Sequence, residues 1–96
     1  MCPNGTYVVV SDMARPLSPA TSLFGERVRL RRQELGLSQE ALADRCGVHW
    51  TFLGQVERGQ RNISLHNLLK LAGGLGVDPG ELVRGLSAPR PDPPPG

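Results

Sequence analysis

Apolar residues in the middle of the chain recur at helical spacing, and short polar or glycine-containing segments separate the runs. In residues 23–35, Phe24, Val28 and Leu35 fall at positions i, i+4 and i+11 of one helix face. Arg31 interrupts this stripe at i+7, but its methylenes can lie along a core while its charged group reaches water. The pattern therefore predicts a first amphipathic helix that ends just before a glycine.

Residues 36–59 predict two short helices joined by a tight turn at Gly47. Ser38 is a favourable N-cap for the first of them, and Gly47 can take a positive φ at low cost. Two short helices that cross at a glycine-containing turn form the outline of a helix-turn-helix, whose second helix enters a DNA major groove. We expect Leu42, Ala43, Cys46, Leu53 and Val56 to face inward, and Trp50, Thr51, Gly54, Gln55 and Arg58 to lie on other faces.

Two further helices are predicted after a connecting loop at residues 59–63. Ser64 should cap a helix that runs to residue 75, in which Gly73 and Gly74 each weaken the last turn by about 0.8–1.0 kcal/mol relative to alanine but permit a close approach of another backbone. Residues 78–81, Asp-Pro-Gly-Glu, are typical of a helix start and begin a short fifth helix. The inward residues of the first of these helices should be Leu65, Leu68, Leu71, Ala72 and Leu75, and the short fifth helix carries the apolar Leu82, Val83 and Leu86.

The fold class predicted from these patterns is a compact all-α domain of five short helices. We place the domain at residues 23–86, after a flexible leader at 1–22 and before a Pro-rich disordered tail at 87–96. The leader could contain a brief extended piece at residues 6–10, and Met13 is an alternative start.

Composition narrows the possible functions without deciding among them. The chain has 96 residues, a net charge of +2 and no apolar run long enough to span a bilayer, so we expect one cytoplasmic domain. Cys46 and His49 have the spacing of a metal-ligand pair, but no second pair completes a site, so no metal or cofactor is expected. Paired carboxylates and a phosphate-binding glycine loop after a strand are also lacking, which argues against an enzyme.

Several of these segments together resemble the phage repressor and Cro-like helix-turn-helix family, often called the Xre family. The resemblance covers residues 25–82 and is carried by GERVRLRRQELGLSQEALA, by the turn CGV, by VERGQRN and by SLHNLLKLAGGLGV. Within that family, HWTFLG followed by VERGQRNISL looks most like the controller proteins of restriction–modification systems. The resemblance implies a lambda-repressor-like DNA-binding domain.

The resemblance also implies roles for individual residues. Base reading falls to Trp50, Thr51 and Gln55, since glutamine can pair with adenine and the threonine methyl can touch thymine. The expected contacts to the DNA backbone are made by Gln39, Arg58, Arg61 and Asn62. Arg32 and Glu57 match a pair that forms an internal salt bridge in similar domains.

Three positions depart from the family pattern. Trp50 stands where a polar or basic residue is more common, and His49 stands where serine or threonine would be a better N-cap. Gly54 removes a side chain from a face expected to be exposed, which would let the helix approach the duplex closely. These departures bear on which sequence is bound more than on whether DNA is bound.

The resulting hypothesis is a transcriptional regulator that binds double-stranded DNA, at a pseudo-palindromic operator, as a homodimer. Dimerisation follows because one short helix reads few base pairs. The expected dimer surface is the fifth helix with the end of the fourth. The alternative is an antitoxin or adaptor that uses the fold mainly to bind another protein, with Trp50 and Phe52 as interface anchors.

Overall fold

Five α-helices make up the part of the chain that the structure, a computed structural model, describes, which is residues 15–88. They are α2 (Pro19–Glu34), α3 (Gln39–Cys46), α4 (Trp50–Glu57), α5 (Leu65–Leu75) and α6 (Pro79–Val83). No strand occurs between residues 15 and 88, and the predicted all-α fold class is confirmed. The extended piece at residues 6–10, the alternative start at Met13 and most of both predicted tails lie outside the described residues.

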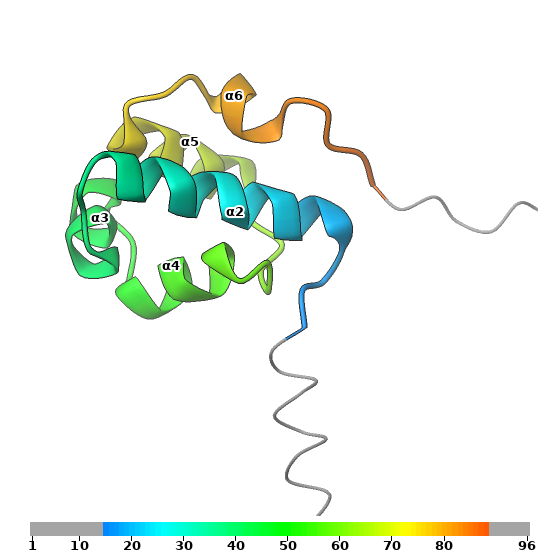
Figure 1. Ribbon diagram of the computed structural model, residues 1–96, viewed down its shortest axis with the longest axis horizontal. Coiled ribbons are helices and arrows are strands. Elements are labelled where there is room, and N and C mark those ends of the chain that lie inside the picture. The colour runs from blue at the N-terminus through cyan, green and yellow to red at the C-terminus, as the bar shows by residue number, and fades with distance from the viewer. Residues whose placement is uncertain (1–14, 89–96) are drawn as a thin grey trace, which may run out of the picture.

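The helices enclose a single core to which all five contribute. Figure 1 shows α2 running across the molecule, with α4 on one side of it and α6 on the other. The helix α3 packs against both α4 and α5, while α6 packs against α2 and α5. The buried apolar residues are Phe24 and Val28 of α2, Leu42, Ala43 and Cys46 of α3, Leu53 and Val56 of α4, Leu71, Ala72 and Leu75 of α5, and Leu82 of α6.

The first helix begins at Pro19, four residues before the predicted start. Ser18 is its N-cap: the Oγ of Ser18 accepts a hydrogen bond from the backbone N–H of Thr21 at 3.1 Å, and the Oγ1 of Thr21 accepts one from the N–H of Ser18 at 3.0 Å. The hydroxyl of Thr21 also lies 2.8 Å from the carbonyl oxygen of Gly59, to which it donates. The threonine thus closes the capping box in place of a glutamate and ties the start of α2 to the end of α4.

Of the residues predicted to face inward in α5, Leu65 is the one for which the prediction is wrong. Its exposed fraction is 70%, whereas Leu71, Ala72 and Leu75 are buried and Leu68 is half-buried against the core. Leu65 is the first residue of α5, directly after the N-cap Ser64, and at this helix end its side chain lies away from the bundle. The apolar stripe therefore continues onto the surface.

The turn between α3 and α4 depends on a left-handed residue. Gly47 has φ 73° and ψ 35°, and its N–H donates to the carbonyl oxygen of Ala43 at 2.9 Å. A residue with a Cβ pays a steric cost in this conformation, whereas glycine does not. The predicted turn residue is the observed one, and it places α4 across the end of α3.

The two adjacent glycines of α5 differ in their surroundings. A Cβ at Gly74 would overlap the Sγ of Cys46 and lie 3.2 Å from the backbone nitrogen of Cys46. A Cβ at Gly73 would meet nothing within 4 Å. The predicted close approach of another backbone is therefore confirmed at Gly74, where α3 and α5 touch, and does not apply to Gly73.

Two arginines of α2 bind carbonyl groups at the ends of the last two helices. Arg27 donates from Nη1 to the carbonyl oxygens of Leu82 at 3.2 Å and Arg84 at 2.7 Å. Arg31 donates from Nε to the carbonyl oxygen of Leu75 at 3.2 Å, so its charged group is not simply directed to water as expected. Carbonyls at a helix end lack partners within the helix, and these side chains supply them.

Candidate nucleic-acid interface

The helix α4 has one face in the core and one face on the surface. Leu53 and Val56 are almost completely buried and fix the helix against α2 and α3. Trp50 and Thr51 are exposed at its first turn, and Gln55 is half-buried one turn later. The three residues predicted to read bases thus lie on an accessible stretch of one helix.

His49 caps the N-terminus of α4, although serine or threonine was expected to do this better. Its Nδ1 accepts from the backbone N–H of Thr51 at 3.1 Å and lies 2.7 Å from the Oγ1 of Thr51. The same ring stacks on Trp50, with centroids 6.0 Å apart and an interplanar angle of 25°. His49 therefore orders both exposed residues at the start of α4.

Trp50 is 49% exposed, although tryptophan is a large and mostly apolar side chain. Its contact with His49 covers one part of the indole and leaves the rest accessible. An exposed indole at the first turn of α4 offers an apolar surface and a single hydrogen-bond donor to a bound molecule.

Gly54 is buried, so the expectation that it lies on an exposed face is wrong. A Cβ at this position would lie 3.3 Å from Nη1 of Arg58 and 3.7 Å from Oε1 of Gln39. These two side chains lie against the helix at Gly54. Because the position has no side chain of its own, Gln39 has room to pass over α4 toward Glu57.

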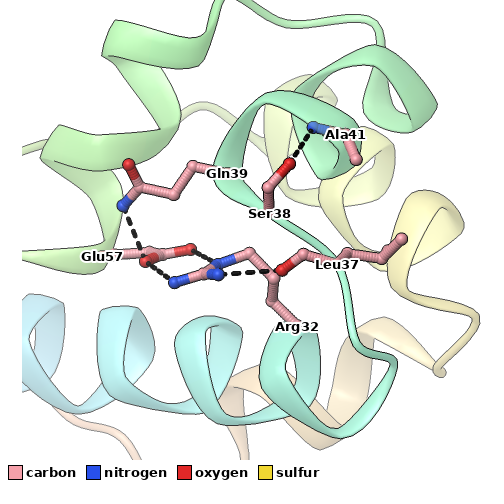
Figure 2. A network of polar contacts seen from close by, with 6 residues as sticks. All are labelled: Arg32, Leu37, Ser38, Gln39, Ala41 and Glu57. Atoms are coloured by element: carbon pink, nitrogen blue, oxygen red, sulfur yellow. Dashed lines mark hydrogen bonds and ion pairs between the residues drawn. The ribbon is translucent and has the colours of Figure 1, made fainter.

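Arg32 of α2 and Glu57 of α4 form a bidentate ion pair in the interior, shown in Figure 2. The Nε of Arg32 donates to Oε2 of Glu57 at 2.6 Å, and Nη2 donates to Oε1 at 3.0 Å. Nη1 of Arg32 donates to the carbonyl oxygen of Leu37 at 2.9 Å. The hydrogen bond to Glu57 raises the pKa of the Arg32 guanidinium, and this effect outweighs the lowering by burial. The pair joins α2, the loop before α3 and the end of α4.

Gln39, the first residue of α3, belongs to the same network. Its Nε2 donates to Oε1 of Glu57 at 3.0 Å, as Figure 2 shows. A contact with phosphate was expected of this side chain, and the second hydrogen of its amide nitrogen is chemically suited to donate to one. The observed bond fixes the start of α3 against the end of α4. The N-terminus of α3 also favours a nearby anion.

The remaining predicted residues lie at and beyond the C-terminal end of α4. Arg58 is exposed and donates from Nε to Oε1 of Gln60 at 3.2 Å. Arg61 is exposed; its Nη1 lies 3.4 Å from Oε1 of Gln55, and its Cζ lies 5.0 Å from the centroid of the Phe52 ring. Asn62 follows in the exposed loop.

Sequence reasoning did not assign His49 to the site, and it named Phe52 only as an anchor in the protein-binding alternative. His49 precedes the first helical residue, where any side-chain acceptor is a candidate N-cap, so a signal was present. Phe52 lies three residues before Gln55, which places both on neighbouring positions of the helix surface, but its contact with Arg61 depends on how the following loop folds back.

The site is a row of hydrogen-bonding and apolar side chains along α4 with arginines at one end. Among residues 15–88, no group of three or more histidine, cysteine or acidic side chains could hold a metal ion. Cys46 is buried, with its Sγ 3.9 Å from the carbonyl oxygen of Leu71. In the same described part of the chain, no helix is both long and apolar enough to cross a membrane.

A family model described as helix-turn-helix (HTH_3) matches residues 28–82 of the chain. This match spans α3, the turn and α4, together with most of the rest of the bundle. The chain belongs to this helix-turn-helix family. Its relatives include control proteins and repressors, and membership in this family identifies the chain as a DNA-binding regulator and not an enzyme.

Two named relatives illustrate the range of the helix-turn-helix family. The control protein C.BamHI from Bacillus amyloliquefaciens is 45% identical over 62 residues, covering 64% of this chain and 76% of the relative. The repressor protein C2 of Salmonella phage P22 is 38% identical over 65 residues, covering 68% of this chain and 30% of the repressor. The resemblance predicted from the sequence is confirmed.

Solved structures of family members have the same fold. The restriction–modification controller protein C.AhdI from Aeromonas hydrophila superposes with a TM-score of 0.63 at 52% identity, covering 65% of this chain and 94% of C.AhdI. The P22 c2 repressor in complex with a synthetic operator superposes with a TM-score of 0.62 at 38% identity, covering 66% of this chain and 96% of the repressor. The lambda-repressor-like architecture is thereby confirmed.

Proposed function

We propose that the chain regulates transcription by binding a pseudo-palindromic operator as a homodimer, with α4 of each copy in a major groove. The observation that carries the proposal is the accessible row of Trp50, Thr51 and Gln55 on a helix whose other face is fixed in the core. The similarity to the P22 c2 repressor, solved with a synthetic operator, supports this role.

The chemistry of the row suits base edges in the major groove. The carboxamide of Gln55 can pair with N6 and N7 of adenine, and the methyl group of Thr51 can contact the methyl group of thymine. The exposed indole of Trp50 adds an apolar surface that also suits a thymine methyl or the sugars of the groove wall.

Contacts to the DNA backbone are assigned to Gln39, Arg58, Arg61 and Asn62. Gln39 lies at the N-terminus of α3, and the other three follow the end of α4, so the set brackets the reading helix. Such contacts supply affinity and fix the position of the protein on the duplex without reading sequence.

The dimer surface is proposed at α6 with α5. Leu65 and Leu69 of α5 and Val83 of α6 are exposed apolar side chains. Leu65 and Val83 line a common groove together with Ile63, Leu68 and Leu86. Because Leu65 is the first residue of α5, the dimer contact is proposed at the start of α5 and not at its end, which was expected from the sequence. Burial of exposed leucine and valine side chains stabilises a dimer, at about 25 cal/mol per Å² of apolar surface.

The genes under control are proposed to be those of a restriction–modification system. This rests on the similarity to C.BamHI and to the restriction–modification controller C.AhdI. Adjacent nuclease and methyltransferase genes would agree with this assignment. A neighbouring toxin gene, and co-purification with its product, would favour the antitoxin alternative.

Binding to the DNA upstream of the gene tests the central proposal. Affinity should fall steeply with salt, because each neutralised phosphate contributes about −0.9 to the slope of log K against log salt. Replacing Arg58 by alanine should reduce the magnitude of that slope by about one unit for each protomer bound. Affinity that does not change with salt, or equal affinity for unrelated DNA, would overturn the proposal.

Sedimentation equilibrium tests the dimer independently of DNA. The Leu65→Asp variant places a charge in the proposed surface at a position that contributes little to the core, so it should stay folded and become monomeric. Leu23→Asp is a matched control, because Leu23 is an exposed leucine of α2 that does not line this groove. A dimer that persists in Leu65→Asp would place the surface elsewhere.

A further inference from the structure

Arg61, in the loop after α4, contacts two side chains of α4 itself. Its guanidinium carbon lies 5.0 Å from the centroid of the Phe52 ring, and Nη1 lies 3.4 Å from Oε1 of Gln55. Phe52 and Gln55 are three residues apart and are therefore neighbours on the helix surface. One side chain from the loop thus reaches a base-reading candidate and the aromatic ring beside it.

We propose that Arg61 is a positioning residue that sets the orientation of the Gln55 carboxamide and so determines which base pair Gln55 prefers. The proposal rests on the proposed function, in which Gln55 faces base edges. It adds to the assigned contact of Arg61 with the DNA backbone, because a guanidinium carries five N–H donors and the bond to Gln55 uses one of them.

The carboxamide of Gln55 has two edges of similar shape and opposite hydrogen-bonding character. A carboxamide has an acceptor oxygen on one side and a donor nitrogen on the other, and a half-turn about its last torsion exchanges them. A free Gln55 could therefore present either edge to the DNA. Arginine can only donate, so Arg61 bonds to Oε1 of Gln55. The reversed orientation of the carboxamide is disfavoured, because it would bring N–H groups of the two side chains together.

The orientation favoured by Arg61 is compatible with adenine. Oε1 of Gln55 has two lone pairs, so it can accept from Arg61 and from N6 of adenine together, while Nε2 donates to N7. The donor and acceptor are then in fixed places before DNA arrives. A reversed carboxamide would offer the opposite pattern, so fixing it increases discrimination between bases.

Phe52 provides the surface that holds the guanidinium. The ring is half-buried and packs against the core, which restricts its motion. A planar guanidinium stacks on an aromatic face and directs its donors within that plane, and lysine, with a compact ammonium group, does neither. Lysine at position 61 would keep a charge near phosphate but would not hold the carboxamide in the same way.

The test measures base preference and not affinity alone. Wild-type protein first selects duplexes from a randomised DNA pool, and the base pair whose preference is lost in Gln55→Ala marks the position under Gln55. Dissociation constants are then measured for the four duplexes that differ only at that pair. The proteins compared are wild type, Arg61→Ala, Arg61→Lys, Arg58→Ala, Gln55→Ala and the double variant Gln55→Ala/Arg61→Ala.

Arg61→Ala should lower the preference for the selected base pair by at least about fivefold, the lower end of what one paired base contact contributes. Arg61→Lys should show a similar loss of preference while keeping the wild-type salt slope. Arg58→Ala is the matched control, because Arg58 is also exposed at this end of α4 but bonds to Gln60. It should weaken all four duplexes by one factor, and so should Arg61→Ala in the Gln55→Ala background.

A uniform weakening of all four duplexes by Arg61→Ala, with a smaller salt slope, would overturn the positioning role and leave the proposed function intact. A wild-type protein that enriches no sequence would overturn the proposed function and the positioning role with it. Thermal unfolding of Arg61→Ala should match wild type, since the side chain is exposed, and this separates a change in reading from a loss of folded protein.

Discussion

Arg32 and Glu57 join α2 to the last residue of α4 through two hydrogen bonds, and both side chains are withdrawn from solvent. The exposed fraction is 13% for the Arg32 side chain and 3% for the Glu57 side chain. Gln39 bonds to the same carboxylate from α3. One carboxylate therefore sets the position of α4 relative to the two helices that precede it.

Replacing Arg32 by methionine should lower the free energy of unfolding by about 3–5 kcal/mol, because it leaves the Glu57 carboxylate buried without its main partner. Urea unfolding followed by circular dichroism measures this loss. The double variant Arg32→Met/Glu57→Met is the control and should recover a large part of it, since the unpaired charge is then gone. A single variant as stable as wild type would contradict this account.

The raised pKa of Arg32 also predicts that its contribution to stability does not depend on pH in the neutral range. A cation whose pKa is raised on folding contributes stability that is fully present below its ordinary value, and for arginine this covers the whole neutral range. The difference in the free energy of unfolding between wild type and Arg32→Met/Glu57→Met should therefore show no contribution from the Arg32 charge that changes between about pH 7 and 9, and urea unfolding across this range measures it.

The adjacent glycines of α5 should respond in opposite directions to alanine. Gly73→Ala adds a methyl group in open space and should stabilise the helix, by up to about 1 kcal/mol. Gly74→Ala forces a methyl group against Cys46 where α3 and α5 touch, and should cost about 1–3 kcal/mol. Thermal unfolding of the two variants tests this pair, and equal shifts would contradict the close contact.

Most of the fold could be predicted because local signals agree with the packing. The N-caps Ser38, Ser64 and Asp78 and the left-handed Gly47 are all where the sequence places them. Each signal involves residues within one helical turn, so no knowledge of the tertiary fold is needed to find it.

The errors occurred where a residue's surroundings come from distant segments. The start of α2 at Pro19 was not predicted, and the bond from Thr21 to Gly59, 38 residues away, anchors that helix start in the tertiary structure. Gly54 is covered by Gln39 from another helix, which periodicity in α4 alone does not show. Leu65 matched the apolar stripe, yet helical spacing does not say where the bundle ends.

The candidate site could be predicted as a set of residues but not as a set of contacts. The family resemblance supplied Trp50, Thr51 and Gln55 in order. The bond from Gln39 to Glu57 depends on how α3 crosses α4, and the bond from Arg61 to Gln55 depends on how the loop after α4 folds back onto that helix. Side-chain partners across such crossings follow only from the folded arrangement.

Replacing His49 by alanine should destabilise the domain by about 0.5–2 kcal/mol, because the N–H of Thr51 loses its acceptor at the start of α4. His49→Ser should be at least as stable as wild type, since serine is a preferred N-cap. Chemical unfolding of the three proteins gives the comparison. If alanine and serine variants are equally stable, the imidazole is not acting as a cap.

Cys46 predicts a loss of stability at alkaline pH. Burial raises the pKa of its thiol, so the folded state keeps the thiol neutral after the unfolded chain has begun to ionise. The stability is fully present below the ordinary thiol pKa, about 8.5, and declines as pH rises from there toward the raised value. Unfolding free energies measured between about pH 8 and 10 should fall more steeply for wild type than for Cys46→Ala, in which every other titrating group is retained. Parallel curves would mean that the thiol ionises equally well in the folded protein, and that the contact between α3 and α5 at Gly74 is open enough to admit water.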